Sequence, residues 1–219
     1  MLKEIIFIFL FIGIITDVFT GHCHNEAELM KRCFVSLPVF SSSNNSYPLT
    51  REQLDESCVE LRNSIKCMDN YTEVCIEKPQ RAIFRTTYSG VTKLVNELCT
   101  RGKYQDEYLE HADCLKRVQP EYEVCSENHI VTLTRVAIER ENVGNGQVSQ
   151  DTYVRTVCCS FQEYLMCSER TVQRMCGDDA ALFTNVFLKR MASNMIKIYC
   201  LEYTGNECGL INNATSTEQ

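Results

Sequence analysis

The sequence lacks the short motifs that mark the common classes of enzyme. It contains no G-x-S-x-G turn, no H-E-x-x-H helix and no glycine-rich phosphate loop. Carboxylate-rich stretches, such as the one with Glu52, Asp55, Glu56 and Glu60, fit a solvated helix surface better than a catalytic pair, because such pairs arise easily on helices. We therefore assign no catalytic residue and expect a protein that is not an enzyme.

The spacing of cysteine and histidine that marks a metal site is also missing. No C-x-x-C pair occurs among the 14 cysteines, and the four histidines are scattered along the chain. We expect no bound metal and no cofactor.

Positive charge is scarce. The formal net charge of the 219-residue chain is −7, and the chain contains no dense run of Lys or Arg. These features argue against nucleic acid or an anionic membrane as the main partner. Beyond residue 15 no apolar stretch approaches the length of a bilayer span, so we expect no membrane span.

The N-terminus carries an apolar run. Residues 5–15 are apolar without interruption and follow Lys3, which matches a signal peptide and is too short to cross a bilayer. We expect residues 1–20 to be a signal peptide, with cleavage between Val18 and His22. Its loss removes one Lys and two acidic residues and changes the formal charge from −7 to −6. The mature protein is therefore predicted to be secreted and extracellular.

All 14 cysteines follow the predicted cleavage region, and an even number in a secreted chain indicates disulfides, here up to seven. Their spacing repeats, with a step of nine and then a step of 24 residues in each half of the chain. The steps are Cys58–Cys67 and Cys75–Cys99 in the first half, and Cys158–Cys167 and Cys176–Cys200 in the second. This pattern predicts an internal duplication of a six-cysteine unit.

Each unit is expected to contain three helices, so the predicted fold is all-α. Thr50 and Gln53 form a capping box that begins one helix. In the second unit, Ser149 or Asp151 begins the corresponding helix and Gly177 ends it. The expected buried stripe of the first of these helices is Leu54, Cys58, Leu61, Ile65 and Met68, and that of the next helix is Ile83, Val91, Leu94, Val95 and Leu98.

The expected organisation follows from these units. Residues 22–102 form the first six-cysteine unit, residues 103–208 form the second, and residues 209–219 form a polar tail. Two six-cysteine units account for twelve of the 14 cysteines. The two that remain are Cys208 and one member of the adjacent pair Cys158 and Cys159.

Helix length limits which cysteines can pair. A straight helix over residues 79–99 is about 30 Å long, whereas the Cα atoms of a disulfide lie about 5.5 Å apart. Cys99 is therefore too far from Cys75 and should return to Cys58. If the first helix of a unit runs antiparallel to the second, the expected pairs are Cys23–Cys75, Cys33–Cys67 and Cys58–Cys99, then Cys114–Cys176, Cys125–Cys167, Cys158–Cys200 and Cys159–Cys208.

The choice between Cys158 and Cys159 depends on helix phase. Cys158 lies nine residues before Cys167, about 180° around the helix, in the same relation as Cys58 to Cys67. An irregularity of one residue in this helix would exchange the roles of Cys158 and Cys159.

Three sequons for N-glycosylation occur, at Asn44, Asn70 and Asn213. Asn44 lies in a polar segment, and Asn70 lies opposite the expected buried stripe of its helix. We expect glycans on both; Asn213 lies in the polar tail near the end of the chain.

Several stretches resemble a family of arthropod secreted cysteine-rich proteins related to the insect 27 kDa hemolymph glycoproteins. They are LTREQLDESC ending at Cys58, IKCMDNYTEVC ending at Cys75, YLEHADCLKRV around Cys114, and CCSFQEYLMC from Cys158 to Cys167. The resemblance covers nearly the whole mature chain, and it implies an extracellular helical protein without an established activity. Similar helical proteins occur in arthropod venoms.

Three functions compete at this point. The first is an extracellular binding or carrier protein for a lipid or another apolar ligand, which a pocket of a few hundred Å3 between helices would favour. The second is a venom component (a toxin) that acts on an ion channel or another receptor. Its surface charge would have to come from small basic groups, Arg81, Arg85 and Lys93 or Arg101 and Lys103. The third is a hydrolase with an unrecognised site.

Overall fold

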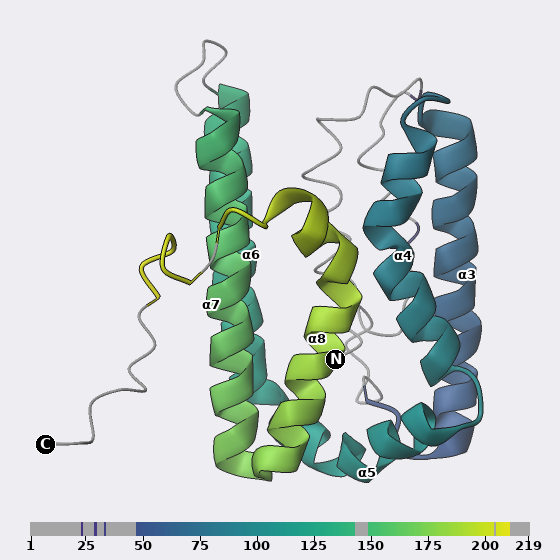
Figure 1. Cartoon of the computed structure of the whole chain (residues 1–219). Helices are drawn as coiled ribbons and strands as arrows, with labels where there is room; N and C mark the ends of the chain where they lie inside the picture. Colours follow the sequence, from purple (N-terminus) through teal and green to yellow (C-terminus); the bar gives the residue numbers. More distant parts are fainter. Residues whose placement is uncertain are drawn as a thin grey trace, which may run out of the picture.

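The computed structural model describes Cys23, Leu29, Cys33 and residues 47–142, 149–203 and 205–210, and it is all-α over them, as predicted (Figure 1). The helices are α3 (Arg51–Cys75), α4 (Arg81–Leu98), α5 (Lys103–Arg117), α6 (Gln119–Asn142), α7 (Gln150–Cys176) and α8 (Asp178–Tyr199). No strand occurs in these described ranges. No helix of this part of the chain is both long and apolar enough to cross a bilayer.

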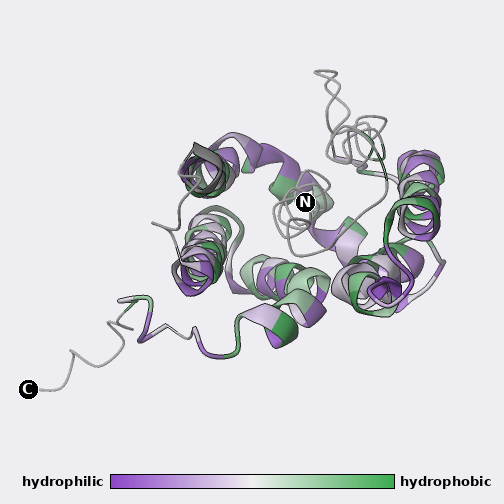
Figure 2. Cartoon of the chain, turned by 90° about the horizontal axis from the view of Figure 1, so that it is seen from above, coloured by the Kyte–Doolittle hydropathy of each residue, from purple (hydrophilic) through white to green (hydrophobic). Residues whose placement is uncertain are grey.

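Five helices pack side by side in the order α3, α4, α8, α7, α6, and α5 lies across one end of them (Figure 1). Viewed from above, hydrophobic and hydrophilic residues alternate along the helices (Figure 2). This arrangement places α8 in the middle, with α4 on one side and α7 on the other. The two halves of the chain therefore meet where α4 packs against α8.

Capping side chains begin two of the long helices where the sequence predicts them. Thr50 Oγ accepts a hydrogen bond from the backbone N–H of Gln53 at 3.3 Å, and Gln53 Oε1 accepts one from the backbone N–H of Leu49 at 2.8 Å. Ser149, and not Asp151, is the N-cap of α7. Gly177 ends α7 with φ 85°, a left-handed conformation that favours glycine, and α8 begins at the next residue.

The buried stripes follow the predicted helical phase with one exception. In α3 the stripe is buried apart from the half-buried Ile65, and in α4 Val91, Leu94, Val95 and Leu98 are buried. The prediction for Ile83 was wrong, because this side chain is 51% exposed, and Phe84 is fully buried in its place. Phe84 lies seven residues before Val91 and so only about 20° from it around the helix, whereas Ile83 lies about 80° away.

The expectation of three helices in the second unit was also wrong, since its described residues, 103–142, 149–203 and 205–208, form four. The expected first helix is divided at Val118 into α5, which carries Cys114, and α6, which carries Cys125. Pro120 is the second residue of α6; proline has no N–H to donate to the preceding turn, so it is tolerated only in the first turn of a helix. In the first unit, Leu29 and Cys33 are helical, and the rest of the expected helix lies outside the described residues. The duplication stays a prediction.

All 14 cysteines form disulfides, and the seven pairs are those expected from helix length and phase. They are Cys23–Cys75, Cys33–Cys67, Cys58–Cys99, Cys114–Cys176, Cys125–Cys167, Cys158–Cys200 and Cys159–Cys208. The bridges close loops of 34 to 62 residues. In the chain-entropy description, loops of this size stabilise the fold by about 4 kcal/mol per bridge, through the unfolded state.

A close approach between α4 and α8 depends on Gly90. A Cβ atom at this position would lie 2.7 Å from the backbone oxygens of both Arg190 and Met191. Polar pairs continue the contact on this side of α4: Asn194 Nδ2 donates to Ser89 Oγ at 2.6 Å. The two halves of the chain are therefore packed backbone against backbone at this point.

Candidate functional site

A groove of about 450 Å3 lies between α7 and α8, and we call it the α7–α8 groove. Phe161 and Leu165 of α7 form its buried floor, and Met166 and Ile196 line it as half-buried side chains. The remaining lining residues are Cys158, Gln162, Glu169, Asn185, Lys189, Ser193, Lys197 and Cys200. Its volume falls in the range of small-molecule pockets, and an apolar floor with a few polar groups at the edge is typical of such sites.

The two helices that form this groove are held by disulfides on several sides. Cys158–Cys200 joins α7 to the end of α8, and it forms part of the wall of the groove. Cys125–Cys167 joins α7 to α6 on the other side. Because these cross-links are covalent, the groove is formed before any ligand arrives, which lowers the cost of ordering on binding.

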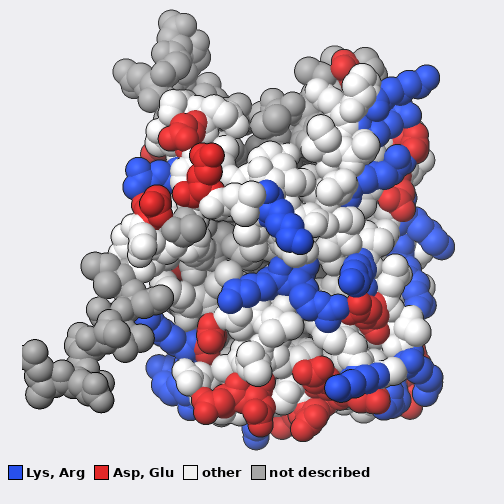
Figure 3. Space-filling model, viewed as in Figure 1, with Lys and Arg blue, Asp and Glu red and all other residues white. Residues whose placement is uncertain are grey.

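Polar groups at the ends of the groove have partners within the protein. Glu169 accepts a hydrogen bond from Asn185, which closes one end. Gln162 donates to the backbone oxygen of Tyr203 at the other end. The cationic groups on the rim belong to α8, and Lys and Arg side chains gather over the middle of this face of the molecule (Figure 3).

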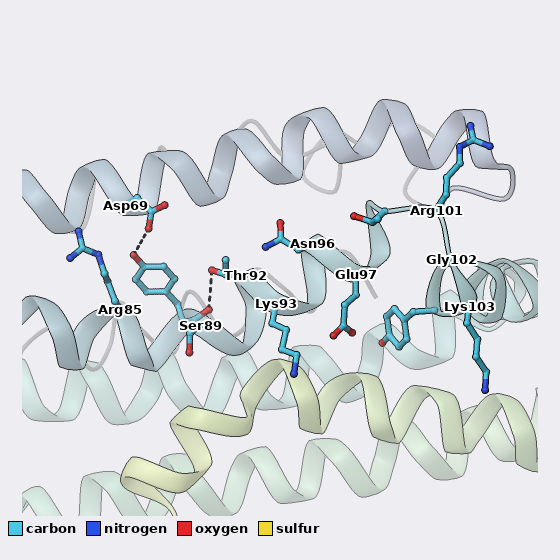
Figure 4. Close-up of a pocket in the computed structure, with 13 residues that line it drawn as sticks. Asp69, Arg85, Ser89, Thr92, Lys93, Asn96, Glu97, Arg101, Gly102 and Lys103 are labelled. Atoms are coloured by element: carbon cyan, nitrogen blue, oxygen red, sulfur yellow. Dashed lines mark hydrogen bonds between the residues drawn. The ribbon is translucent and has the colours of Figure 1, made fainter.

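A second, larger groove of about 770 Å3 follows α4 and the turn into α5 (Figure 4). Most of its charged and phenolic groups are already paired. The pairs are Asp69–Tyr88, Arg85–Glu73, Arg101–Asp55 and Glu97–Arg190. Lys93 and Lys103 are the lining cations that have no partner among the described residues. Burial raises the pKa of Tyr88, so its hydroxyl stays protonated and donates to Asp69.

This pairing bears on the small basic groups that the sequence offers for a toxin surface. Arg81 and Arg85 both bind Glu73, and Arg101 binds Asp55. Two carboxylates therefore offset part of the positive charge of these three arginines, which reduces the positive charge available for a basic channel-blocking surface along α4.

A buried histidine–serine pair joins α6 to α7, and sequence reasoning missed it. His129 Nδ1 and Ser160 Oγ are 2.7 Å apart, and the two residues are only 3% and 5% exposed. The ring of Tyr164 stacks on the imidazole, with centroids 5.6 Å apart. The two partners lie 31 residues apart on different helices, so no spacing motif could have revealed them.

The geometry of this pair is that of a nucleophile beside a base, but its surroundings favour a structural role. Burial lowers the pKa of His129 to about 4, whereas a general base works best with a pKa near the working pH. The cavity beside the pair measures about 130 Å3, well below the usual size of a ligand pocket. We interpret the pair as a hydrogen bond that ties two helices together.

The structure places one of the three predicted glycosylation sites. Asn70 is exposed on α3, as its helical phase predicts, while Asn44 and Asn213 lie outside the described residues. Among the described residues, no group of three or more His, Cys, Asp or Glu side chains is arranged to hold a metal ion.

Comparison of the chain with protein-family models, with curated proteins and with solved structures found no match.

Proposed function

We propose that this protein is a secreted, non-enzymatic binding or carrier protein that holds a small apolar or amphipathic ligand in the α7–α8 groove. The observation that carries the proposal is the groove itself, about 450 Å3 between two helices, with Phe161 and Leu165 as its floor. Ligand pockets of this kind bury most of the ligand against apolar side chains and use few polar groups for orientation.

Two further observations support the extracellular setting. A framework of seven disulfides is typical of proteins in an oxidising environment, such as secreted proteins. The apolar run over residues 5–15 and the resemblance to arthropod hemolymph proteins point the same way.

A neutral fluorescent probe such as N-phenyl-1-naphthylamine tests the proposal. The chain has no tryptophan, so the emission of the probe can be followed without that background. Met166→Glu places a charge inside the groove and should weaken probe binding by at least about tenfold, because the carboxylate must lose water there. The matched control is Met175→Glu on the same helix, at a side chain that is 45% exposed and does not line the groove.

The expected result is binding by the wild type and the control, with loss in Met166→Glu. Far-UV circular dichroism checks that both variants remain helical. Absence of probe binding by the wild type, or an equal loss in both variants, would contradict the proposal.

A further inference from the structure

The rim of the α7–α8 groove carries a charge pattern that narrows the class of ligand. Lys189 and Lys197 lie eight residues apart on α8, about 80° apart around the helix and about 12 Å apart along its axis, and both line the groove. Ser193 lies halfway between them and also lines the groove. Two cationic side chains therefore stand beside an apolar floor.

Neither lysine is neutralised within the part of the chain that the structure describes. No described carboxylate forms an ion pair with Lys189 or Lys197, and no described group hydrogen-bonds to either ammonium. The carboxylate that lines the groove, Glu169, lies on the α7 wall and accepts a hydrogen bond from Asn185. In the larger groove the two lining arginines, Arg85 and Arg101, are paired, whereas the α7–α8 groove contains two cations and no ion pair among the described residues.

This local excess of positive charge contrasts with the chain as a whole, whose formal net charge is −7. A purely apolar ligand would use the floor and leave both ammonium groups without a partner. A ligand with an apolar chain and an anionic head would use both, because lysines favour a carboxylate partner and their flexible side chains can reach across the rim.

Building on the carrier function proposed above, we propose that the α7–α8 groove binds a long-chain fatty acid. Its hydrocarbon chain lies along Phe161, Leu165 and Ile196, and its carboxylate lies between Lys189 and Lys197. Charge complementarity at the rim is the feature that distinguishes this ligand from a neutral lipid.

Displacement of the neutral naphthyl probe by palmitate and by hexadecanol tests the assignment. The two molecules have the same chain length and differ in charge. Palmitate should bind the wild type about three- to tenfold more tightly than hexadecanol, because each exposed ion pair contributes modestly. The preference should decline as salt is added, since salt screens exposed charges.

The variant Lys189→Gln/Lys197→Gln should bind palmitate as weakly as the wild type binds hexadecanol, with hexadecanol binding unchanged. The control Lys66→Gln/Lys116→Gln removes two exposed lysines from α3 and α5, away from the groove. It changes the net charge by the same amount and should keep the preference for palmitate.

The possible failures are distinguishable. Equal binding of palmitate and hexadecanol by the wild type would overturn the fatty-acid assignment and leave the carrier function standing, whereas no displacement and no probe binding would refute both. Loss of hexadecanol binding in the groove variant would show that the lysines act through the shape of the groove. Sedimentation of the protein with anionic phospholipid vesicles, without displacement by monomeric palmitate, would replace the groove with a membrane-surface site and overturn the assignment.

Discussion

Acid should destabilise this fold through His129, by an amount that its burial determines. In the folded protein, burial lowers the pKa of His129 from 6.5 to about 4. Between these values the unfolded chain binds a proton that the folded protein does not, so the free energy of unfolding falls as the pH decreases. From pH 7.5 to pH 5.0 this histidine alone should lower the free energy of unfolding by about 2 kcal/mol.

The groups around the imidazole explain why the charged form is disfavoured. His129 is 3% exposed, its Nδ1 shares a hydrogen bond with Ser160, and the ring of Tyr164 stacks on it. Glu163 is the carboxylate that lines the small cavity beside the pair, and its side chain is exposed to solvent. Desolvation of the imidazolium is therefore the dominant effect on this histidine.

Guanidinium denaturation followed by far-UV circular dichroism, with disulfides intact, measures the effect at pH 7.5 and pH 5.0. The variant His129→Asn does not titrate and retains a polar group near the position of Nδ1. Because the chain contains many acidic residues besides this histidine, the informative quantity is the pH-induced loss of stability in the wild type minus that in the variant. A constant cost of the substitution cancels from this difference, which should be about 2 kcal/mol.

The variant Ser160→Ala separates burial from hydrogen bonding as the cause. It keeps the imidazole in place but removes its partner on α7, so the excess loss of stability in acid should remain. If His129→Asn lost as much stability between pH 7.5 and pH 5.0 as the wild type, the reasoning from burial would be refuted.

Two further predictions concern α4 and α3. Gly90→Ala should lower the free energy of unfolding by about 2 kcal/mol, because its Cβ would lie 2.7 Å from two backbone oxygens of α8. The control Gly102→Ala, where a Cβ has nothing within 4 Å, should change the free energy of unfolding by less than about 0.5 kcal/mol. Guanidinium denaturation compares the two variants, and an equal effect would contradict the close-packing argument. Enzymatic deglycosylation of the secreted protein should increase its gel mobility, and Asn70→Gln and Asn44→Gln should each remove part of that shift; unchanged mobility would refute both sites.

The disulfide pattern could be predicted because it depends on quantities that the sequence contains. Helix length excludes a bridge between Cys75 and Cys99, and helix phase distinguishes Cys158 from Cys159. Both arguments use only local geometry, and regular helices in α3 and α7 satisfy it. The capping residues Thr50 and Ser149 were predictable for the same reason.

The two wrong predictions have different causes, and helix phase alone could have corrected the first. Ile83 is strongly apolar, but its phase turns it to solvent, and Phe84 occupies the buried position. One expected helix is divided at Val118, because Pro120 has no N–H to donate and is tolerated only in the first turn of a helix, here α6. The contact between His129 and Ser160 depends on how α6 packs against α7, and the spacing of residues in the sequence does not give that packing.

The α7–α8 groove could not be predicted from the sequence either, because it also depends on how two helices pack. Several large apolar side chains of α8 fill the core and do not line the groove: Phe187, Leu188, Met191 and Met195 are at most 1% exposed. The groove is instead built at the edge of the helix pair, from the half-buried Met166 and Ile196 above a buried floor.

Lys189 and Lys197 are indistinguishable in the sequence from any other lysines on a solvated helix face. The proposed role of these lysines depends on the packing of α7 against α8. This packing places an apolar surface beside the two lysines, which have no partners among the described residues. Met166 and the two lysines are not part of the buried core, whereas Phe161 and Leu165 belong to both the core and the floor of the groove. A substitution at Met166 or at either lysine can change binding without repacking the core, and for this reason binding and stability can be measured independently in the same variants.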